Sequence, residues 1–178
     1  METGEVALVE VTGTGGSTGT VLEGYLVNKT PTSKRLAVQF DAPIFLLNSG
    51  SGQNMVATQI SERGGRYYIA PEDDERPFIR LEPSEKLPVS LFAYCVDFGK
   101  NNPSRDDLLM PRELPAYLLK IMSRISKYEK PSPDASTMNG AQAALWSTQG
   151  ISLDEIKKKF KLDAEDEAKM REILQAIE

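Results

Sequence analysis

The stretch Val89-Ser-Leu-Phe-Ala-Tyr-Cys-Val-Asp97 marks the point where the sequence changes from one pattern of hydrophobicity to another. Alternation along a strand places Cys95 on the same face as Leu91 and Ala93. Cys95 is the only cysteine of the chain. It lies just before the change of pattern, so side chains from both halves of the chain can meet there.

Before this point, the sequence predicts a series of short strands. Apolar or alternating runs are separated by turn residues such as glycine, proline, asparagine and serine. These runs cover residues 6–11, 21–28, 35–40, 44–47, 55–60, 66–70, 78–81 and 89–96. Short strands with frequent turns favour an antiparallel β-sandwich or barrel up to about Phe98.

After this point, the spacing changes to that of amphipathic helices. Apolar residues recur at three and four positions: Leu114, Tyr117, Leu118, Ile121, Met122, Ile125 and Tyr128. The small, apolar residues 141–147 predict a buried helix that ends at a C-terminal cap formed by Gly150. The capping box Ser152-Leu-Asp-Glu155 predicts the start of the next helix. Asp163 is expected to cap a last helix, which has Met170, Ile173, Leu174 and Ile177 on one face. The predicted class is therefore α+β, with a β domain over 1–98 and a helical subdomain over 99–178 that packs on it and is able to share its core.

The amino-acid composition excludes several classes of function. The chain of 178 residues has a net charge of −5, no histidine and one cysteine. The absence of histidine excludes Ser-His-Asp and Cys-His catalysis, and one cysteine excludes an internal disulfide or a multi-cysteine metal cluster. An acidic chain without a basic stripe does not predict a nucleic-acid partner, and no apolar run is long enough for membrane insertion. We therefore expect no cofactor and no metal.

A second residue stands out beside Cys95. Gln142, within Ala141-Gln-Ala-Ala-Leu-Trp146, is the one strongly polar side chain in a small, apolar helical turn. Burying an amide without partners costs about 1–3 kcal/mol. Gln142 therefore either bonds to neighbouring backbone, faces solvent or serves a specific purpose.

Together, the two segments resemble the thioester domains of bacterial surface adhesins. Those domains carry an aromatic-Cys-aliphatic motif on a strand, here Tyr94-Cys95-Val96, and further along an apolar-Gln-x-x-apolar-apolar motif on a helix, here 141–146. The segment around Gln53-Asn-Met-Val56 is also similar. The resemblance implies that the Cys95 sulfur and the Gln142 side-chain carbonyl join as an internal thioester with release of ammonia.

The resemblance also implies a function: covalent attachment to an amine nucleophile on a target surface, either a protein or a small amine. Cys95 would be the leaving group, Gln142 the acyl donor, and Tyr94, Leu145 and Trp146 would shield or orient the bond. This is a single-use reaction and not enzymatic turnover. It implies a secreted or cell-surface protein, whereas the polar, acidic start of the chain, which is unlike a signal peptide, leaves a cytoplasmic location as the alternative.

Two other interpretations remain open. The first is a non-covalent interaction or structural module on the same scaffold, with Cys95 as a core residue and Gln142 as a packing amide. The second is an ordinary cysteine enzyme, which the sequence favours least because no general base is evident. The oligomeric state and the target are not defined by the sequence.

Overall fold

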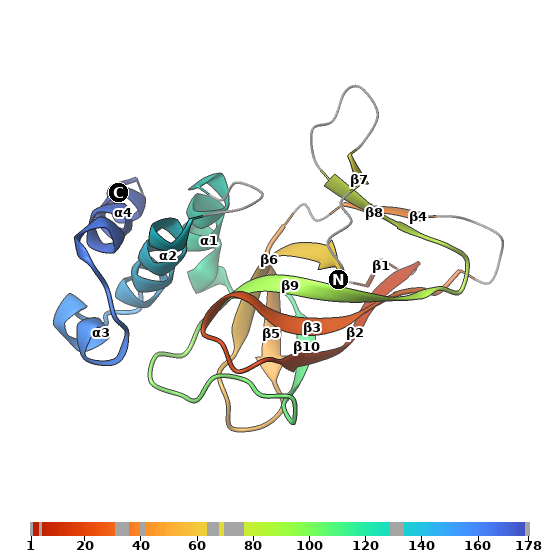
Figure 1. Cartoon of the computed structure of the whole chain (residues 1–178), viewed down its shortest axis with the longest axis horizontal. Coiled ribbons are helices and arrows are strands. Elements are labelled where there is room, and N and C mark those ends of the chain that lie inside the picture. Colours follow the sequence, from red (N-terminus) through yellow and green to blue (C-terminus); the bar gives the residue numbers. More distant parts are fainter. Residues whose placement is uncertain are drawn as a thin grey trace.

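The computed structural model describes residues 2–3, 5–30, 36–39, 42–63, 68–69, 77–128 and 134–176. Strands occupy the first part of the chain and four helices the second (Figure 1). The strands are β1 (Glu2–Thr3), β2 (Val6–Gly13), β3 (Thr18–Asn28), β4 (Leu36–Gln39), β5 (Ile44–Asn48), β6 (Met55–Glu62), β7 (Tyr68–Ile69), β8 (Pro77–Leu81), β9 (Lys86–Cys95) and β10 (Leu108–Arg112). The predicted strand over 66–70 lies partly outside the described residues.

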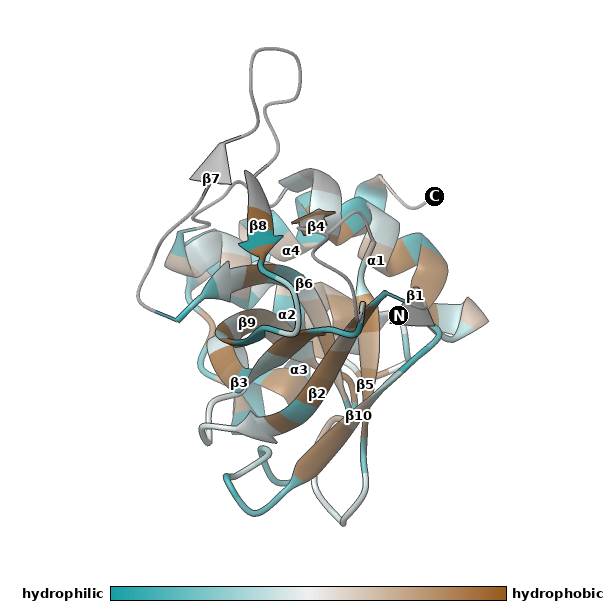
Figure 2. Cartoon of the chain, turned by 90° about the vertical axis from the view of Figure 1, so that its right-hand side faces the viewer, coloured by the Kyte–Doolittle hydropathy of each residue, from teal (hydrophilic) through white to brown (hydrophobic). Residues whose placement is uncertain are grey.

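Six strands form a closed antiparallel barrel. The order is β2-β10-β5-β6-β9-β3, and β3 pairs back with β2 to complete the ring. The short β1 adds to β2, and β4, β8 and β7 form a separate small sheet beside the barrel (Figure 1). In Figure 2 hydrophobic residues follow the barrel strands and hydrophilic ones gather at the turns. The α+β class is confirmed, and of the two predicted β architectures the structure has the barrel.

Strand β9 is held on both sides, and both of its neighbours have a register shift beside Phe92. The register of β3 shifts between Thr20 and Leu22, opposite the step from Phe92 to Leu91, and the register of β6 shifts between Ala57 and Gln59, opposite the step from Ala93 to Phe92. Bulges increase local twist and bend a strand, which helps a sheet close on itself. The result brings the end of β9, with Cys95, to the side of the barrel that faces the helices.

The barrel extends beyond the predicted domain boundary. Strand β10 lies between β2 and β5, so the β part of the molecule ends at Arg112 and not near Phe98. The signal in the sequence is weak because β10 is short and only Leu109 is deeply buried, whereas Leu108 is 46% exposed. A chain break at residue 98 would therefore remove one barrel strand.

The helices are α1 (Ala116–Tyr128), α2 (Ala135–Ser147), α3 (Leu153–Lys159) and α4 (Ala164–Gln175). Asp134 caps α2, and the predicted capping residues Ser152 and Asp163 both form capping boxes. Helix α2 ends at Ser147, and Gly150 takes a left-handed φ of 86° in the turn that follows.

One predicted helix face needs correction. Leu118, Ile121, Met122 and Ile125 of α1 are buried, but Tyr117 is 61% exposed. The four buried residues follow the spacing of a single stripe, and Tyr117 lies one position outside it. Elsewhere, α4 buries Met170 and Ile173 as predicted, and Ile177 lies outside the described residues. A single apolar core cluster includes residues of the barrel and of all four helices.

The loop between β9 and β10 is fixed to the end of the barrel by backbone contacts. The Gly13 N–H donates to Ser104 O and the Gly15 N–H donates to Pro103 O, each at 2.9 Å. A Cβ on Gly13 would lie 2.0 Å from Pro103 O, so this approach requires glycine. The same loop carries Asn102, which contacts the site described below.

We expect Gly13→Ala to lower the melting temperature by about 4–10 °C, because overpacking against backbone typically costs 1–3 kcal/mol. Gly50→Ala is the matched control, since its Cβ would meet only the Asp107 and Asn48 side chains, at 3.3 and 3.4 Å. Thermal unfolding followed by circular dichroism measures both. Equal shifts for the two variants would show that the loop is not fixed through Gly13.

Candidate functional site

Cys95 is the last residue of β9, at the position where its pairing with β3 ends. It lies opposite Met55 of β6, while Thr18, the first residue of β3, lies opposite Tyr94. The Cys95 N–H therefore has only Ser17 O, at 3.2 Å, as a backbone partner on that side. The residue has no exposed surface. The strand thus presents one buried residue whose backbone groups are not fully used by the sheet.

Gln142 lies in the middle of α2, among small residues. Ala141, Ala143 and Ala144 are fully buried, as is Gln142 itself, and Gly140 is also buried. A Cβ on Gly140 would lie 2.9 Å from Asp166 O of α4, so α2 is closely packed on its other side as well. Small side chains let the helix approach both neighbours, and only Gln142 brings a polar group into this contact.

The structure brings the two predicted residues together. The Cys95 N–H donates to Gln142 Oε1 at 2.8 Å, and Gln142 Nε2 donates to Cys95 O at 2.8 Å. Reversing the amide would place Oε1 against another carbonyl and Nε2 against another N–H, so this orientation is the one the contacts allow. Cδ of Gln142 is bonded to both atoms and therefore lies beside the backbone of Cys95.

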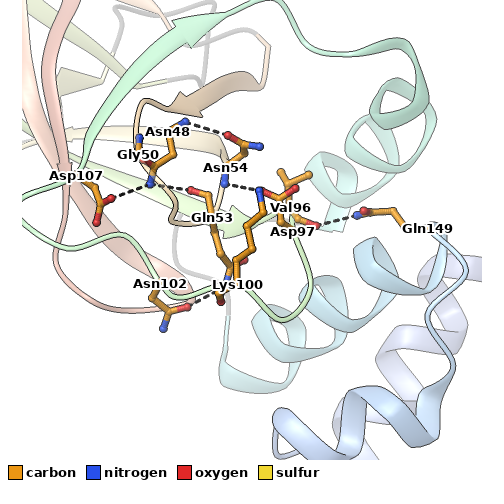
Figure 3. A network of polar contacts seen from close by, with 10 residues as sticks. All are labelled: Asn48, Gly50, Gln53, Asn54, Val96, Asp97, Lys100, Asn102, Asp107 and Gln149. Atoms are coloured by element: carbon orange, nitrogen blue, oxygen red, sulfur yellow. Dashed lines mark hydrogen bonds and ion pairs between the residues drawn. The ribbon is translucent and has the colours of Figure 1, made fainter.

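The sulfur faces a polar network. Cys95 Sγ donates to Asn102 Oδ1 at 3.7 Å, and the same oxygen accepts from Gln53 Nε2 at 3.1 Å. Gln53 also donates to Lys100 O at 2.9 Å (Figure 3). Asn102 Nδ2 donates to Gly15 O at 3.0 Å. These bonds fix the position of Asn102, and Asn102 in turn fixes the direction of the thiol.

The chain just after Cys95 is held by a second set of contacts. Gln149, at the end of α2, donates to Val96 O at 3.0 Å, and the Asn54 N–H donates to Asp97 Oδ2 at 2.8 Å (Figure 3). Asp97 Oδ2 also forms an ion pair with Lys100 at 3.2 Å. Helix α2 is therefore joined to the end of β9 by two glutamine side chains.

Burial controls the protonation of the thiol. The pKa of Cys95 is raised from 9.0 to about 12, first by desolvation and then by the negative charge of Asp97. The thiol therefore stays protonated at neutral pH. A standing thiolate, which a cysteine nucleophile needs, is strongly disfavoured here.

The three residues predicted to shield the bond are all buried, but they differ in direction. Leu145 and Trp146 lie on α2, and Trp146 packs edge-on against Phe98 and Phe160, with ring centroids 5.1 and 5.3 Å apart. Tyr94 packs against Phe92 at 5.6 Å, on the face of β9 opposite to Cys95. Leu145 and Trp146 therefore lie on the helix that carries Gln142 and Tyr94 lies on the other face of β9, and the shielding of the bond by all three stays a prediction.

Several residues of the site were not found from the sequence. Asn102 lies in a stretch that predicted only a linker, and Gln149 lies in a turn. Gln53 was noted only for its similarity to the adhesin domains. Asn102 contacts Cys95 across only 7 positions, but it is held in place through contacts between distant residues, such as Gln53 with Asn102 across 49 positions and Asn102 with Gly15 across 87. Local patterns carry no signal for such contacts.

Within the described ranges, no group of three or more cysteine, aspartate and glutamate side chains is placed to hold a metal ion. None of the described helices has the length and apolar character needed to cross a bilayer. Comparison with protein-family models, with curated proteins and with solved structures finds no match. The function is therefore argued from the site alone.

For protein with a free Cys95 thiol, we expect stability to fall as the pH rises above 9. Below pH 9 the thiol is protonated in both states, so its contribution is complete; between pH 9 and about 12 only the unfolded chain loses the proton. The folding equilibrium constant should then fall about tenfold per pH unit from this group.

Denaturant midpoints at pH 8 and pH 10 measure this fall, after thiol titration of the unfolded chain has verified the free thiol. Cys95→Ala is the control, because it removes the titrating group. The explanation is wrong if the variant loses as much stability between the two pH values as the wild-type chain does.

Proposed function

We propose that Cys95 and Gln142 form an internal thioester through which the protein attaches covalently to amines. The observation that carries this proposal is the pair of 2.8 Å hydrogen bonds that hold the Gln142 carboxamide against Cys95, with both residues fully buried. The electrophilic carbon thus lies beside the residue that bears the nucleophile. Such positioning is the main requirement of an intramolecular reaction.

Bond formation needs only groups that are present. The sulfur bonds to Cδ, the bond from Cδ to Nε2 breaks, and the thiol proton leaves with the nitrogen as ammonia. The Cys95 N–H already donates to Oε1 at 2.8 Å, so it stabilises the negative charge that develops on this oxygen. Because its pKa is raised, the thiol is protonated at rest, so its proton must pass to Nε2 as the sulfur attacks Cδ.

The surroundings favour a long-lived bond. Leu145 and Trp146 exclude water from the contact, and hydrolysis requires water. A sulfur with a high pKa is also a slower leaving group than an ordinary thiol. The thioester would then persist until an amine enters, attacks Cδ and releases the thiol. This is single-use attachment to a protein or small amine on a target surface, consistent with a secreted or cell-surface location.

A second candidate is a non-covalent interaction or structural module. It is favoured by the completeness of the present contacts: both ends of the Gln142 amide have partners, and Sγ has its own partner in Asn102. In this case Gln142 joins α2 to the barrel as a buried amide, and Cys95 is a core residue. An enzyme with a thiolate nucleophile gains no support, because burial keeps the thiol protonated.

The intact mass distinguishes the two candidates. We expect wild-type protein to be lighter than calculated by one ammonia, and to gain one methylamine after treatment with that amine. Cys95→Ala and Gln142→Ala should have full mass and should not react. Gln149→Ala, in the turn that follows the same helix, is the matched control and should keep the bond, since its amide contacts Val96 and Leu145.

A full calculated mass that methylamine leaves unchanged would refute the thioester and establish the non-covalent candidate. Loss of the bond in Gln149→Ala together with Gln142→Ala would instead indicate that the whole α2–β9 contact, and not the one amide, is required.

A further inference from the structure

The two hydrogen bonds at Cys95 determine which hydrogen of the Gln142 amide is used. Both Oε1 and Nε2 contact backbone groups of one residue, at 2.8 Å each. An amide is planar, so the hydrogen of Nε2 that points to Cys95 O is the one on the same side of the C–N bond as Oε1. That position must hold a hydrogen if both contacts are to form.

We propose that the contact between the Gln142 side chain and the Cys95 backbone accepts an unsubstituted carboxamide and rejects a substituted one. Opening of the thioester by ammonia is then reversible, whereas opening by a primary amine is not. This inference rests on the proposed thioester and specifies what becomes of its products. It identifies the substrate class as primary amines whose attached carbon cannot be accommodated afterwards.

Opening of the thioester by ammonia and by a primary amine gives different products. The amine nitrogen bonds to Cδ, the bond from Cδ to sulfur breaks, and a proton of the amine moves to Sγ. With ammonia the product is Gln142 itself, and both hydrogen bonds return. With a primary amine the product is a secondary amide, whose trans form is preferred on the order of 100-fold over cis.

The trans form places the amine's carbon on the same side as Oε1, where the donating hydrogen was. The carbon then points at Cys95 O and the N–H points away. Cys95 and Gln142 have no exposed surface, and the alanines beside Gln142 are equally buried, so the substituent has no adjacent solvent to enter. The substituted side chain must leave the contact, and Cδ leaves the sulfur with it.

The test compares the two amines on the full-length protein. Thioester-containing protein is opened with ammonia or with methylamine, the amine is removed by buffer exchange, and intact mass and melting temperature are followed with time. We expect the ammonia-opened protein to lose ammonia again, and the methylamine adduct to persist with a melting temperature about 5–10 °C lower than that of the ammonia-opened protein. Equal rates of re-closure, or equal melting temperatures, would overturn the inference.

A second experiment tests the contact even if the thioester does not form. Because Cys95 is the only cysteine, residues 1–94 and 95–178 can be ligated at this residue, with glutamine methylated on Nε2 at position 142. We expect this chain to melt about 5–10 °C below the chain ligated with ordinary glutamine, or to fail to fold where that chain folds. The same methylation at Gln175, the exposed last residue of α4, is the matched control and should have little effect.

The two experiments distinguish a failure of the proposed function from a failure of this inference. A wild-type chain of full mass refutes the proposed function, and the ligated chains then still decide whether the contact rejects a substituted amide. A methylated chain as stable as the unmodified one refutes the inference even if the thioester forms.

Discussion

The need of a buried amide for partners fixes the relation between the helices and the barrel. Gln142 has no exposed surface, and an amide left unsatisfied in such a place costs roughly 1–3 kcal/mol. Its two partners are the N–H and C=O of a single residue, Cys95. A shift of α2 by one residue along β9 would break both bonds at once. The packing of small apolar residues around Gln142 allows several positions, and the amide selects one of them.

The barrel makes this contact possible because strand β3 does not extend as far as β9 at this end of the barrel. β3 begins at Thr18, opposite Tyr94, so the backbone of Cys95 extends past its neighbour. In an ordinary sheet the next residue of the partner strand would exchange both bonds with Cys95. Here Ser17 O and the carboxamide of Gln142 share that place. A side chain from a helix thus adds to a β-ladder at its end, beside the cysteine of the chain.

Much of this arrangement could be predicted from residues that carry local signals. The capping residues Ser152 and Asp163 and the alternation of β9 were recognisable because each depends on neighbours in the sequence. The association of Cys95 with Gln142 was predicted from two ordered motifs, and the structure confirms the contact, whereas the covalent bond remains a prediction. Strand β10 was missed because Leu109 is its only deeply buried residue. Asn102 was missed because its function arises from loops that are distant in the sequence.

The closed ring of strands would also have a mechanical consequence if the protein held its target through the proposed covalent bond. Tension applied at Gln142 would pass to α2 and, through the apolar core that α2 shares with the strands, to the barrel. An open sheet under such tension can be peeled from an edge, one hydrogen bond at a time. The barrel has no such edge, since each of its six strands is bonded on both sides. Extraction of β9 would have to shear its pairings with β3 and β6 together, so the ring would share the load among many bonds.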